Sequence, residues 1–135
     1  MRIAVTATRT WANREYLYGV LDGIHASQTL TVVVHDADDE LTPEWARLNH
    51  VKTLPFKAHW DEVGRGAGAR RNEAMLTYGR PELVIAFLEN GSLGSAAAGA
   101  LDLVGRARAI DLECWVFSGP KAPGAARSLE TTKSA

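Results

Sequence analysis

Two uninterrupted apolar runs place the strongest constraint on how this chain can fold. Residues 30–35 (LTVVVH) and 82–88 (ELVIAFL) lack the polar–apolar alternation of a strand with one solvated face. Continuous apolar runs are typical of strands buried on both faces, as in a parallel sheet covered by helices. Three further strands are predicted over residues 2–8, 51–56 and 113–118.

Segments with helical periodicity separate these strands. One helix is predicted to follow Asn13, which is a good N-cap, and a short one to begin with Thr42 as N-cap and Pro43 at its first position. Two more are predicted over residues 69–78 and after the turn at 89–92. Strands that alternate with helices predict an α/β fold, here a Rossmann-like three-layer sandwich around a mostly parallel five-stranded sheet.

Size and composition fit a single globular domain. The chain has 135 residues, of which 46% are hydrophobic and 23% charged, so it is not a largely disordered protein. We expect the domain to cover residues 1–119, because the segment that follows is rich in Pro, Gly, Ser, Thr and Lys. Residues 120–135 are predicted to be a flexible C-terminal tail.

Charge and cysteine content disfavour several classes of function. Fifteen Lys and Arg against 16 Asp and Glu give a net charge of −1, which argues against nucleic acid as a partner. The single cysteine, Cys114, excludes an internal disulfide framework, and the four histidines lack metal-ligand spacing. No metal or cofactor is therefore expected. Because neither a leader pattern nor a membrane-length apolar run is present, we expect a cytoplasmic protein without a membrane partner.

Two polar loops follow the first two predicted strands, at the sheet edge where parallel sheets bind ligands. Residues 6–11 (TATRTW) include Arg9, whose guanidinium suits a phosphate or carboxylate, although a plain surface turn explains the segment equally well. Residues 36–40 (DADDE) could bind ribose hydroxyls or a hard cation, or charge the start of a short helix. Asp36, nearest the strand end, is the better site candidate.

Two glycine-containing segments complete the predicted site. Residues 68–72 (GARRN) lead into a helix whose free N–H groups and two arginines would attract an anion, the alternative being a solvated basic turn. Residues 89–95 (ENGSLGS) permit tight turning and supply hydroxyls at the next helix start, as many ordinary turns also do. Trp11 and Trp60 lie near the predicted binding site. We favour a packing role for both side chains over stacking on the base of a ligand.

The candidate ligand-binding residues are drawn from these segments and from the nearby strand and helix ends. They are Thr8, Arg9, Thr10, Trp11, His35, Asp36, Gly68, Arg71, Asn72, Met75, Glu89, Asn90, Gly91, Ser92, Gly94 and Ser95. No residue is assigned a catalytic role.

Four of the segments, in this order, resemble one family. Residues 5–11 resemble a V-T-G-S-R-T-W turn, residues 56–60 an F-P-A-D-W segment, residues 67–75 an A-G-x-x-R-N-x-x-M helix start, and residues 89–95 a D-G-x-S-x-G-T loop. These motifs are similar to those of the YspA-like, cpYpsA-related branch of the SLOG superfamily, which also includes the Lonely Guy phosphoribohydrolases and the SMF/DprA proteins. The resemblance spans residues 1–118 and implies a Rossmann-like fold that binds a nucleotide or nucleotide-derived ligand.

The chain departs from the family pattern at three places. Ala7 replaces a glycine, and the acidic residues 36–40 replace a Gly- and Arg-rich phosphate loop. Ala98 stands where the phosphoribohydrolases carry a glutamate that helps catalysis. The missing general acid or base makes an active glycosidase doubtful.

The leading prediction is a protein that binds a nucleotide-derived small molecule as a sensor or sequestering protein. Arg9, Arg71 and the helix start at Gly68 would hold phosphate, and Asp36 would bind ribose hydroxyls. A phage or mobile-element protein that captures a signalling nucleotide fits the same features. The alternatives are a nucleotide N-glycosidase or phosphoribohydrolase that uses Glu89 or Asp36, and a ligand-free oligomeric scaffold. A homo-oligomer is expected, and the base, the phosphate count and a linear or cyclic ligand stay open.

Overall fold

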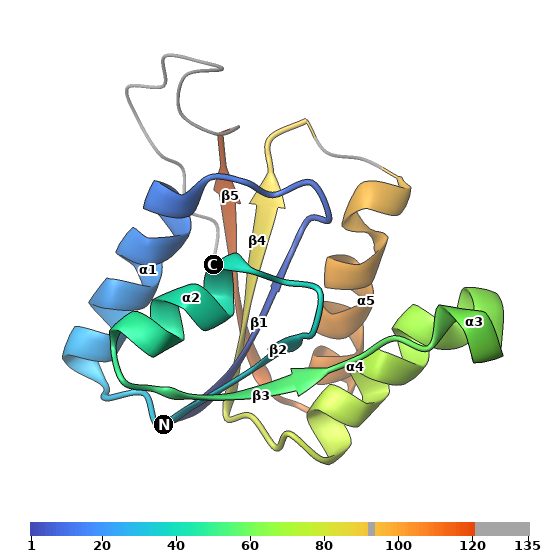
Figure 1. Cartoon of the computed structure of the whole chain (residues 1–135), viewed down its shortest axis with the longest axis horizontal. Helices are drawn as coiled ribbons and strands as arrows, with labels where there is room; N and C mark the ends of the chain where they lie inside the picture. The colour runs from blue at the N-terminus through green and yellow to red at the C-terminus, as the bar shows by residue number, and fades with distance from the viewer. Residues whose placement is uncertain (92–93, 121–135) are drawn as a thin grey trace.

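The chain forms one five-stranded sheet in which every pair of neighbouring strands is parallel. The computed structural model describes residues 1–91 and 94–120 (Figure 1). The strands are β1 (Arg2–Ala7), β2 (Val32–Asp36), β3 (Lys52–Phe56), β4 (Leu83–Glu89) and β5 (Glu113–Gly119). Their order in the sheet is β3-β2-β1-β4-β5. The predicted Rossmann-like α/β fold is confirmed, and the sheet is parallel throughout.

Helices cover both faces of this sheet and form the two outer layers (Figure 1). They are α1 (Arg14–Ser27), α2 (Leu41–Leu48), α3 (Trp60–Val63), the 3₁₀ turn η1 (Gly64–Gly66), α4 (Ala67–Thr77) and α5 (Ser95–Ala109). Helices α1 and α2 cover one face, whereas α4 and α5 pack together on the other. The short helix α3 projects at one end of the molecule, beyond the start of α4 (Figure 1).

The core consists of two apolar clusters, one on each face of the sheet. Successive residues of β1 point to opposite faces, so Ile3 and Val5 join the cluster under α1 and α2 while Ala4 joins the cluster under α4 and α5. Trp45 of α2 is fully buried in the first cluster. Burial on both faces explains why the central strands are continuous apolar runs.

Local signals predicted some helix ends correctly and missed others. Asn13 caps α1 as expected, because its side-chain oxygen accepts a hydrogen bond from the backbone N–H of Tyr16 (3.1 Å). The prediction that Thr42 caps the next helix is wrong: α2 begins at Leu41, and the carboxylate of Asp39 accepts from the N–H of Thr42 (3.1 Å). Helix α4 begins at Ala67, two residues before the predicted start.

The strand order reverses between β1 and β4. The chain runs from β1 outward to β3, the edge strand that contains Pro55, and then returns to place β4 on the other side of β1. A reversal of this kind opens a crevice at the carboxyl ends of the two central strands. Among the described residues, no helix has the length and apolar character required to cross a membrane.

Candidate functional site

A cleft of about 930 Å³ lies at the carboxyl ends of β1 and β2. Its walls are the end of β1 with the loop that follows, the loop after β2, Trp60 with the start of α4, and the first turns of α5. The volume is in the range of small-molecule sites. The structure brings together several of the predicted site residues there: Thr8, Arg9, Trp11, Asp36, Gly68, Arg71, Asn72 and Ser95.

The loop after β1 is fixed to β4 and to α5. The backbone N–H of Glu89 donates to the hydroxyl of Thr8 (2.9 Å), and the N–H of Thr8 donates to the carbonyl of Phe87 (2.9 Å). The next N–H, that of Arg9, donates to the carbonyl of Ala96 in α5 (2.8 Å). The Arg9 side chain is exposed, and its guanidinium reaches the hydroxyl of Ser95 (3.5 Å). A cationic group is therefore held beside the first turn of α5.

Arg71 and Asp36, which the sequence assigned to separate parts of a ligand, form an ion pair with each other. The distance from Nη1 of Arg71 to Oδ2 of Asp36 is 2.7 Å, and Nε of Arg71 donates to the side-chain oxygen of Asn72 (3.1 Å). The Arg71 side chain is only 10% exposed, whereas that of Asp36 is 33% exposed. The pair joins the start of α4 to the end of β2. A ligand that binds either side chain would have to bind it alongside this ion pair.

Asn72 connects α4 to α5 from a buried position. Its side-chain amide donates to the carbonyl of Gly99 (2.9 Å) and to the carboxylate of Asp102 (3.0 Å). Arg106 binds the same oxygen of Asp102 (2.8 Å). These contacts fix the α5 turns that line the cleft, so Asn72 has a clear structural role in addition to its place in the cleft wall.

Other predicted residues lie outside the cleft lining. The described members of this group are Thr10, His35, Met75, Glu89, Asn90, Gly91 and Gly94, while Ser92 falls outside the described residues. Met75 is buried in the core under α4 and α5, because it lies on the helix face opposite the solvent. Thr10 donates to the carboxylate of Glu89 (3.3 Å), so those two side chains satisfy each other.

The glycines after β4 permit the turn that reaches α5. Gly91 and Gly94 have φ values of +80° and +66°, a region that other residues rarely adopt. His35 is buried, and its Nδ1–H donates to the carbonyl of Asp36 (2.7 Å), which fixes the ring beside the end of β2. None of these three residues lines the cleft.

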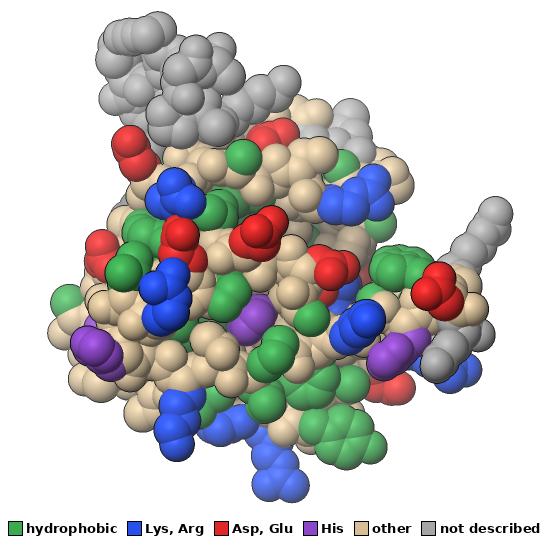
Figure 2. Space-filling view, in the orientation of Figure 1, with side chains coloured by type: hydrophobic (Ala, Val, Ile, Leu, Met, Phe, Trp, Pro, Cys, Tyr) green, Lys and Arg blue, Asp and Glu red, His purple; other side chains and the backbone are tan. Residues whose placement is uncertain are grey.

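Charge is distributed unevenly around the cleft. The segment at the end of β2 contributes Asp36, Asp38, Asp39 and Glu40 to the lining, where Arg71 pairs with Asp36, and Arg9 lies beside Ser95 at the start of α5. Figure 2 shows acidic and basic side chains interspersed on the face that carries α1 and α2. The carboxylates of the segment at the end of β2 that have no ion-pair partner among the described residues would repel a negatively charged ligand group, and Arg9 would attract it.

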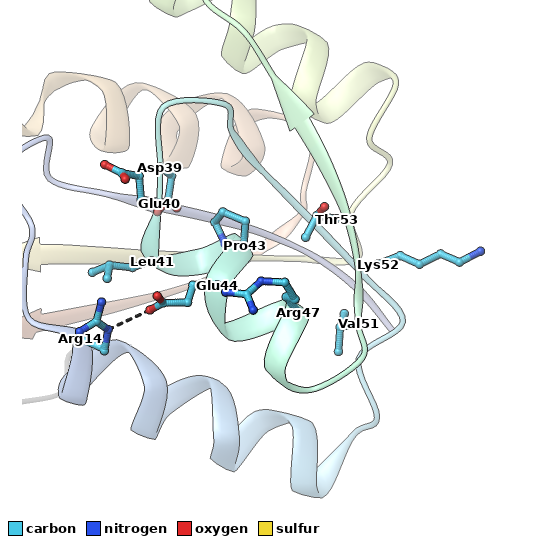
Figure 3. A pocket seen from close by; sticks show the side chains of 10 residues that line it. All are labelled: Arg14, Asp39, Glu40, Leu41, Pro43, Glu44, Arg47, Val51, Lys52 and Thr53. Atoms are coloured by element: carbon cyan, nitrogen blue, oxygen red, sulfur yellow. Dashed lines mark hydrogen bonds and ion pairs between the residues drawn. The ribbon is translucent and has the colours of Figure 1, made fainter.

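A second hollow, of about 760 Å³, lies beside the cleft between α2, the start of α1 and β3 (Figure 3). Nε of Arg14 and a carboxylate oxygen of Glu44 form an ion pair there (2.9 Å), and the Tyr18 hydroxyl also contacts that carboxylate. The hydrogen bond from Tyr18, followed by contact with Arg14, lowers the pKa of Glu44 against the opposing effect of burial. Lys52 points away from the other labelled side chains (Figure 3).

The sequence predicted Ser95 at the start of α5, but sequence reasoning missed the later turns of this helix as part of the cleft wall. Ser95, Ala98, Gly99 and Asp102 line the cleft at the helical spacing i, i+3, i+4 and i+7, which was visible in the sequence as a small and polar stripe. Within residues 1–91 and 94–120, no three His, Cys, Asp or Glu side chains are arranged to hold a metal ion.

Comparison with solved structures supports the fold. The chain is similar to the crystal structure of glycinamide ribonucleotide transformylase 1 from Symbiobacterium toebii, with 22% sequence identity and a TM-score of 0.50. The match covers 96% of this chain but 56% of that one, so this chain spans just over half the length of that protein. At this identity the likeness concerns the fold alone. No curated protein matches the chain.

One protein-family model matches the first part of the chain, residues 1–62. The motifs at residues 67–75 and 89–95 lie beyond the end of this match. Residues 1–62 match the YAcAr family, described as the YspA, cpYpsA-related SLOG family, which confirms the predicted resemblance over this part of the chain.

Proposed function

We propose that this protein binds a nucleotide or nucleotide-derived ligand in the cleft and acts as a sensor or sequestering protein. The observation that carries the proposal is the position of Arg9, fixed beside the start of α5 at the point where the strand order reverses. Ligands of open α/β sheets bind at such a reversal. The family resemblance over residues 1–62 favours the same class of ligand.

The phosphate of the ligand is proposed to bind between Arg9 and the first turn of α5. Helix α5 has 15 residues, and its N-cap, Gly94, offers no side-chain hydrogen bond to the first amides. A helix start of this kind favours an anion, and the guanidinium adds two parallel donors. Ser95 would add a hydroxyl that already lies within reach of Arg9.

The sugar is proposed to bind at Asp36. Its carboxylate accepts from Arg71 through Oδ2 and from the N–H of Asp38 through Oδ1 (3.0 Å). A carboxylate can accept about four hydrogen bonds, so capacity remains for ribose hydroxyls on its exposed side. The negative segment around it would keep the phosphate beside Arg9.

The N-glycosidase or phosphoribohydrolase alternative has less support. Ala98 lines the cleft at the position of the family glutamate and has no titratable group. The carboxylate of Glu89 is outside the cleft lining and binds Thr10. Binding without turnover therefore agrees better with the site. A homo-oligomer, a cytoplasmic location and capture of a signalling nucleotide remain predictions from the sequence.

Isothermal titration with AMP, GMP, CMP, UMP and ribose 5-phosphate tests the proposal. We expect at least one nucleotide to bind, and Arg9→Ala to weaken its affinity about tenfold or more, because a hydrogen bond to a charged group contributes roughly 1.5–3 kcal/mol. Arg70→Ala is the matched control, since Arg70 is exposed on α4 and outside the cleft lining but carries the same charge. It should change affinity less than about twofold.

Two results would contradict the proposal. Absence of binding to every probe would exclude nucleoside monophosphates as the ligand and contradict the expected binding. If Arg9→Ala and Arg70→Ala lose the same amount of affinity, binding depends on net charge and not on the proposed site. Release of free base from a bound monophosphate, abolished by Glu89→Gln, would instead support the enzyme alternative.

A further inference from the structure

Trp60 is an exposed aromatic side chain in the wall of the cleft. It is the first residue of α3 and has 53% of its surface exposed. The other three tryptophans have an evident role in packing: Trp45 is fully buried with its indole N–H on Asp22 (2.8 Å), the Trp11 ring lies against Tyr16 and Phe87, and Trp115 packs against the core. Within the described residues, the Trp60 indole has neither an acceptor nor an aromatic partner. Its exposed ring is unexplained by the fold.

We propose that Trp60 is the platform on which the base of the bound nucleotide stacks. The inference rests on the proposed function and adds the ligand class: a nucleoside phosphate, with purines bound more tightly than pyrimidines and both more tightly than a sugar phosphate. Base–aromatic stacking contributes about 1–3 kcal/mol per base and needs only a positioned ring with one open face. The larger ring system of a purine covers more of the indole.

Gly68 positions the Trp60 ring. A Cβ placed on Gly68, at the second position of α4, would lie 3.3 Å from Cη2 and 3.8 Å from Cζ2 of Trp60. The six-membered part of the indole therefore packs directly on the glycine, at a distance that a side chain there would disturb. The contact with Gly68 restrains one end of the ring, and about half of the Trp60 surface stays exposed for a ligand.

Arg71 connects this platform to the proposed phosphate site. The same Cβ position on Gly68 is 3.9 Å from Nη2 of Arg71, and a Cβ on Gly99 of α5 would lie 3.4 Å from that nitrogen. Nη2 of Arg71 thus lies between the indole and the wall formed by α5. A nucleotide with its base on Trp60 and its phosphate at the start of α5 would pass this guanidinium, with its ribose near Asp36.

Titration of the full chain with AMP, UMP and ribose 5-phosphate tests the inference. We expect AMP to bind more tightly than UMP, and UMP more tightly than ribose 5-phosphate. Trp60→Ala should weaken AMP binding about fivefold to a hundredfold, the range given by the stacking energy, and should change ribose 5-phosphate binding less than about twofold. Trp60→Phe should retain most of the affinity for AMP because it keeps an aromatic face.

A control and a second variant separate stacking from folding. Tyr78→Ala removes an aromatic side chain that is 73% exposed at the other end of α4, and it should leave AMP binding unchanged. Gly68→Ala should displace the indole by a few tenths of an ångström. That variant should lower AMP affinity more than ribose 5-phosphate affinity while the urea unfolding midpoint is unchanged or raised, since alanine favours a helix.

Each outcome either supports or overturns the inference. Equal affinity of the unmodified protein for AMP and ribose 5-phosphate would overturn it, as would AMP binding that is unaffected by Trp60→Ala. If in that case Arg9→Ala still weakens AMP, the proposed function stands without the platform. If none of the three probes binds, this inference fails, and the proposed function fails with it when GMP and CMP do not bind either.

Discussion

At the scale of single residues, the cleft is built from side chains that serve the fold and leave part of their capacity for a ligand. Arg71 is nearly buried, and its charge is balanced by Asp36. A buried guanidinium without a partner would be costly, so the pair explains why both residues are needed even when the cleft is empty. Thr8 likewise uses its hydroxyl to join the ends of β1 and β4.

The Tyr18–Glu44–Arg14 group predicts how stability depends on pH. The folded pKa of Glu44 lies below its usual value of 4.5, first because of the Tyr18 hydrogen bond and also because of Arg14. Its contribution to stability is therefore present above about pH 4.5 and is lost as the pH falls through the lower folded pKa. Tyr18→Phe should raise the pKa of Glu44 toward its usual value and reduce the loss of stability on acidification.

Urea unfolding of both proteins at several pH values between 6 and 3 measures this difference. Tyr78→Phe removes the hydroxyl of an exposed tyrosine and should follow the unmodified protein. If the free energy of unfolding falls equally with decreasing pH in Tyr18→Phe and in the unmodified protein, the hydroxyl does not influence the pKa of Glu44.

At the scale of elements, the close approach of α4 to β2 depends on the glycine that follows the helix. A Cβ on Gly79 would lie 2.2 Å from the carbonyl oxygen of Met75 and 2.8 Å from Cγ1 of Val34. The first contact is with backbone, which has little freedom to move. Gly79, unlike most glycines of the chain, is therefore at a position where no side chain fits.

Gly79→Ala is therefore expected to destabilise the protein by about 2–4 kcal/mol, in the range of overpacking and backbone clashes. Gly19→Ala is the matched control, because nothing lies within 4 Å of a Cβ at this exposed position in α1. The control should be more stable by about 0.5–1 kcal/mol. Chemical denaturation at neutral pH measures both, and a loss below about 1 kcal/mol in Gly79→Ala would contradict the expectation.

At the scale of the whole molecule, the sheet and core that the structure describes lie within the first 120 residues. All five strands and both core clusters lie there, and the last described contact is the donation from the Asn13 side chain to the carbonyl of Pro120 (3.1 Å). Strand β5 ends at Gly119, and the domain boundary predicted at that residue stays a prediction. Whether residues 120–135 form a tail stays a prediction.

A chain that ends at Pro120 should fold to the same stability as the full chain. We expect the two thermal midpoints to agree within about 2 °C and the affinity for AMP to agree within about twofold. Differential scanning calorimetry and titration of both proteins provide the measurements. A drop of more than about 5 °C, which corresponds to roughly 1 kcal/mol for a domain of this size, would assign a structural role to the removed residues.

Much of the fold could be predicted because its signals are local. The apolar runs of β2 and β4, the Asn13 cap and the edge position of the Pro55 strand each depend on a few adjacent residues. The cap of α2 was predicted wrongly because the helix begins one residue before Thr42: Glu40 is its N-cap, Thr42 is buried inside the first turn, and the carboxylate of Asp39 accepts from the N–H of Thr42. Met75 has helical spacing suited to either the cleft or the core, and only packing placed it in the core.

The sequence by itself determined the alternation of strands and helices, because period and capping act over a few residues of chain. Only the tertiary structure decided the strand order, which set β1 beside β4 and gathered Arg9, Trp60 and the start of α5 around one cleft. It also paired Arg71 with Asp36, 35 residues away in the sequence. The physical reason is that contacts between residues far apart in the sequence form only after the crossover helices have packed on the sheet. No local pattern of residues encodes such contacts.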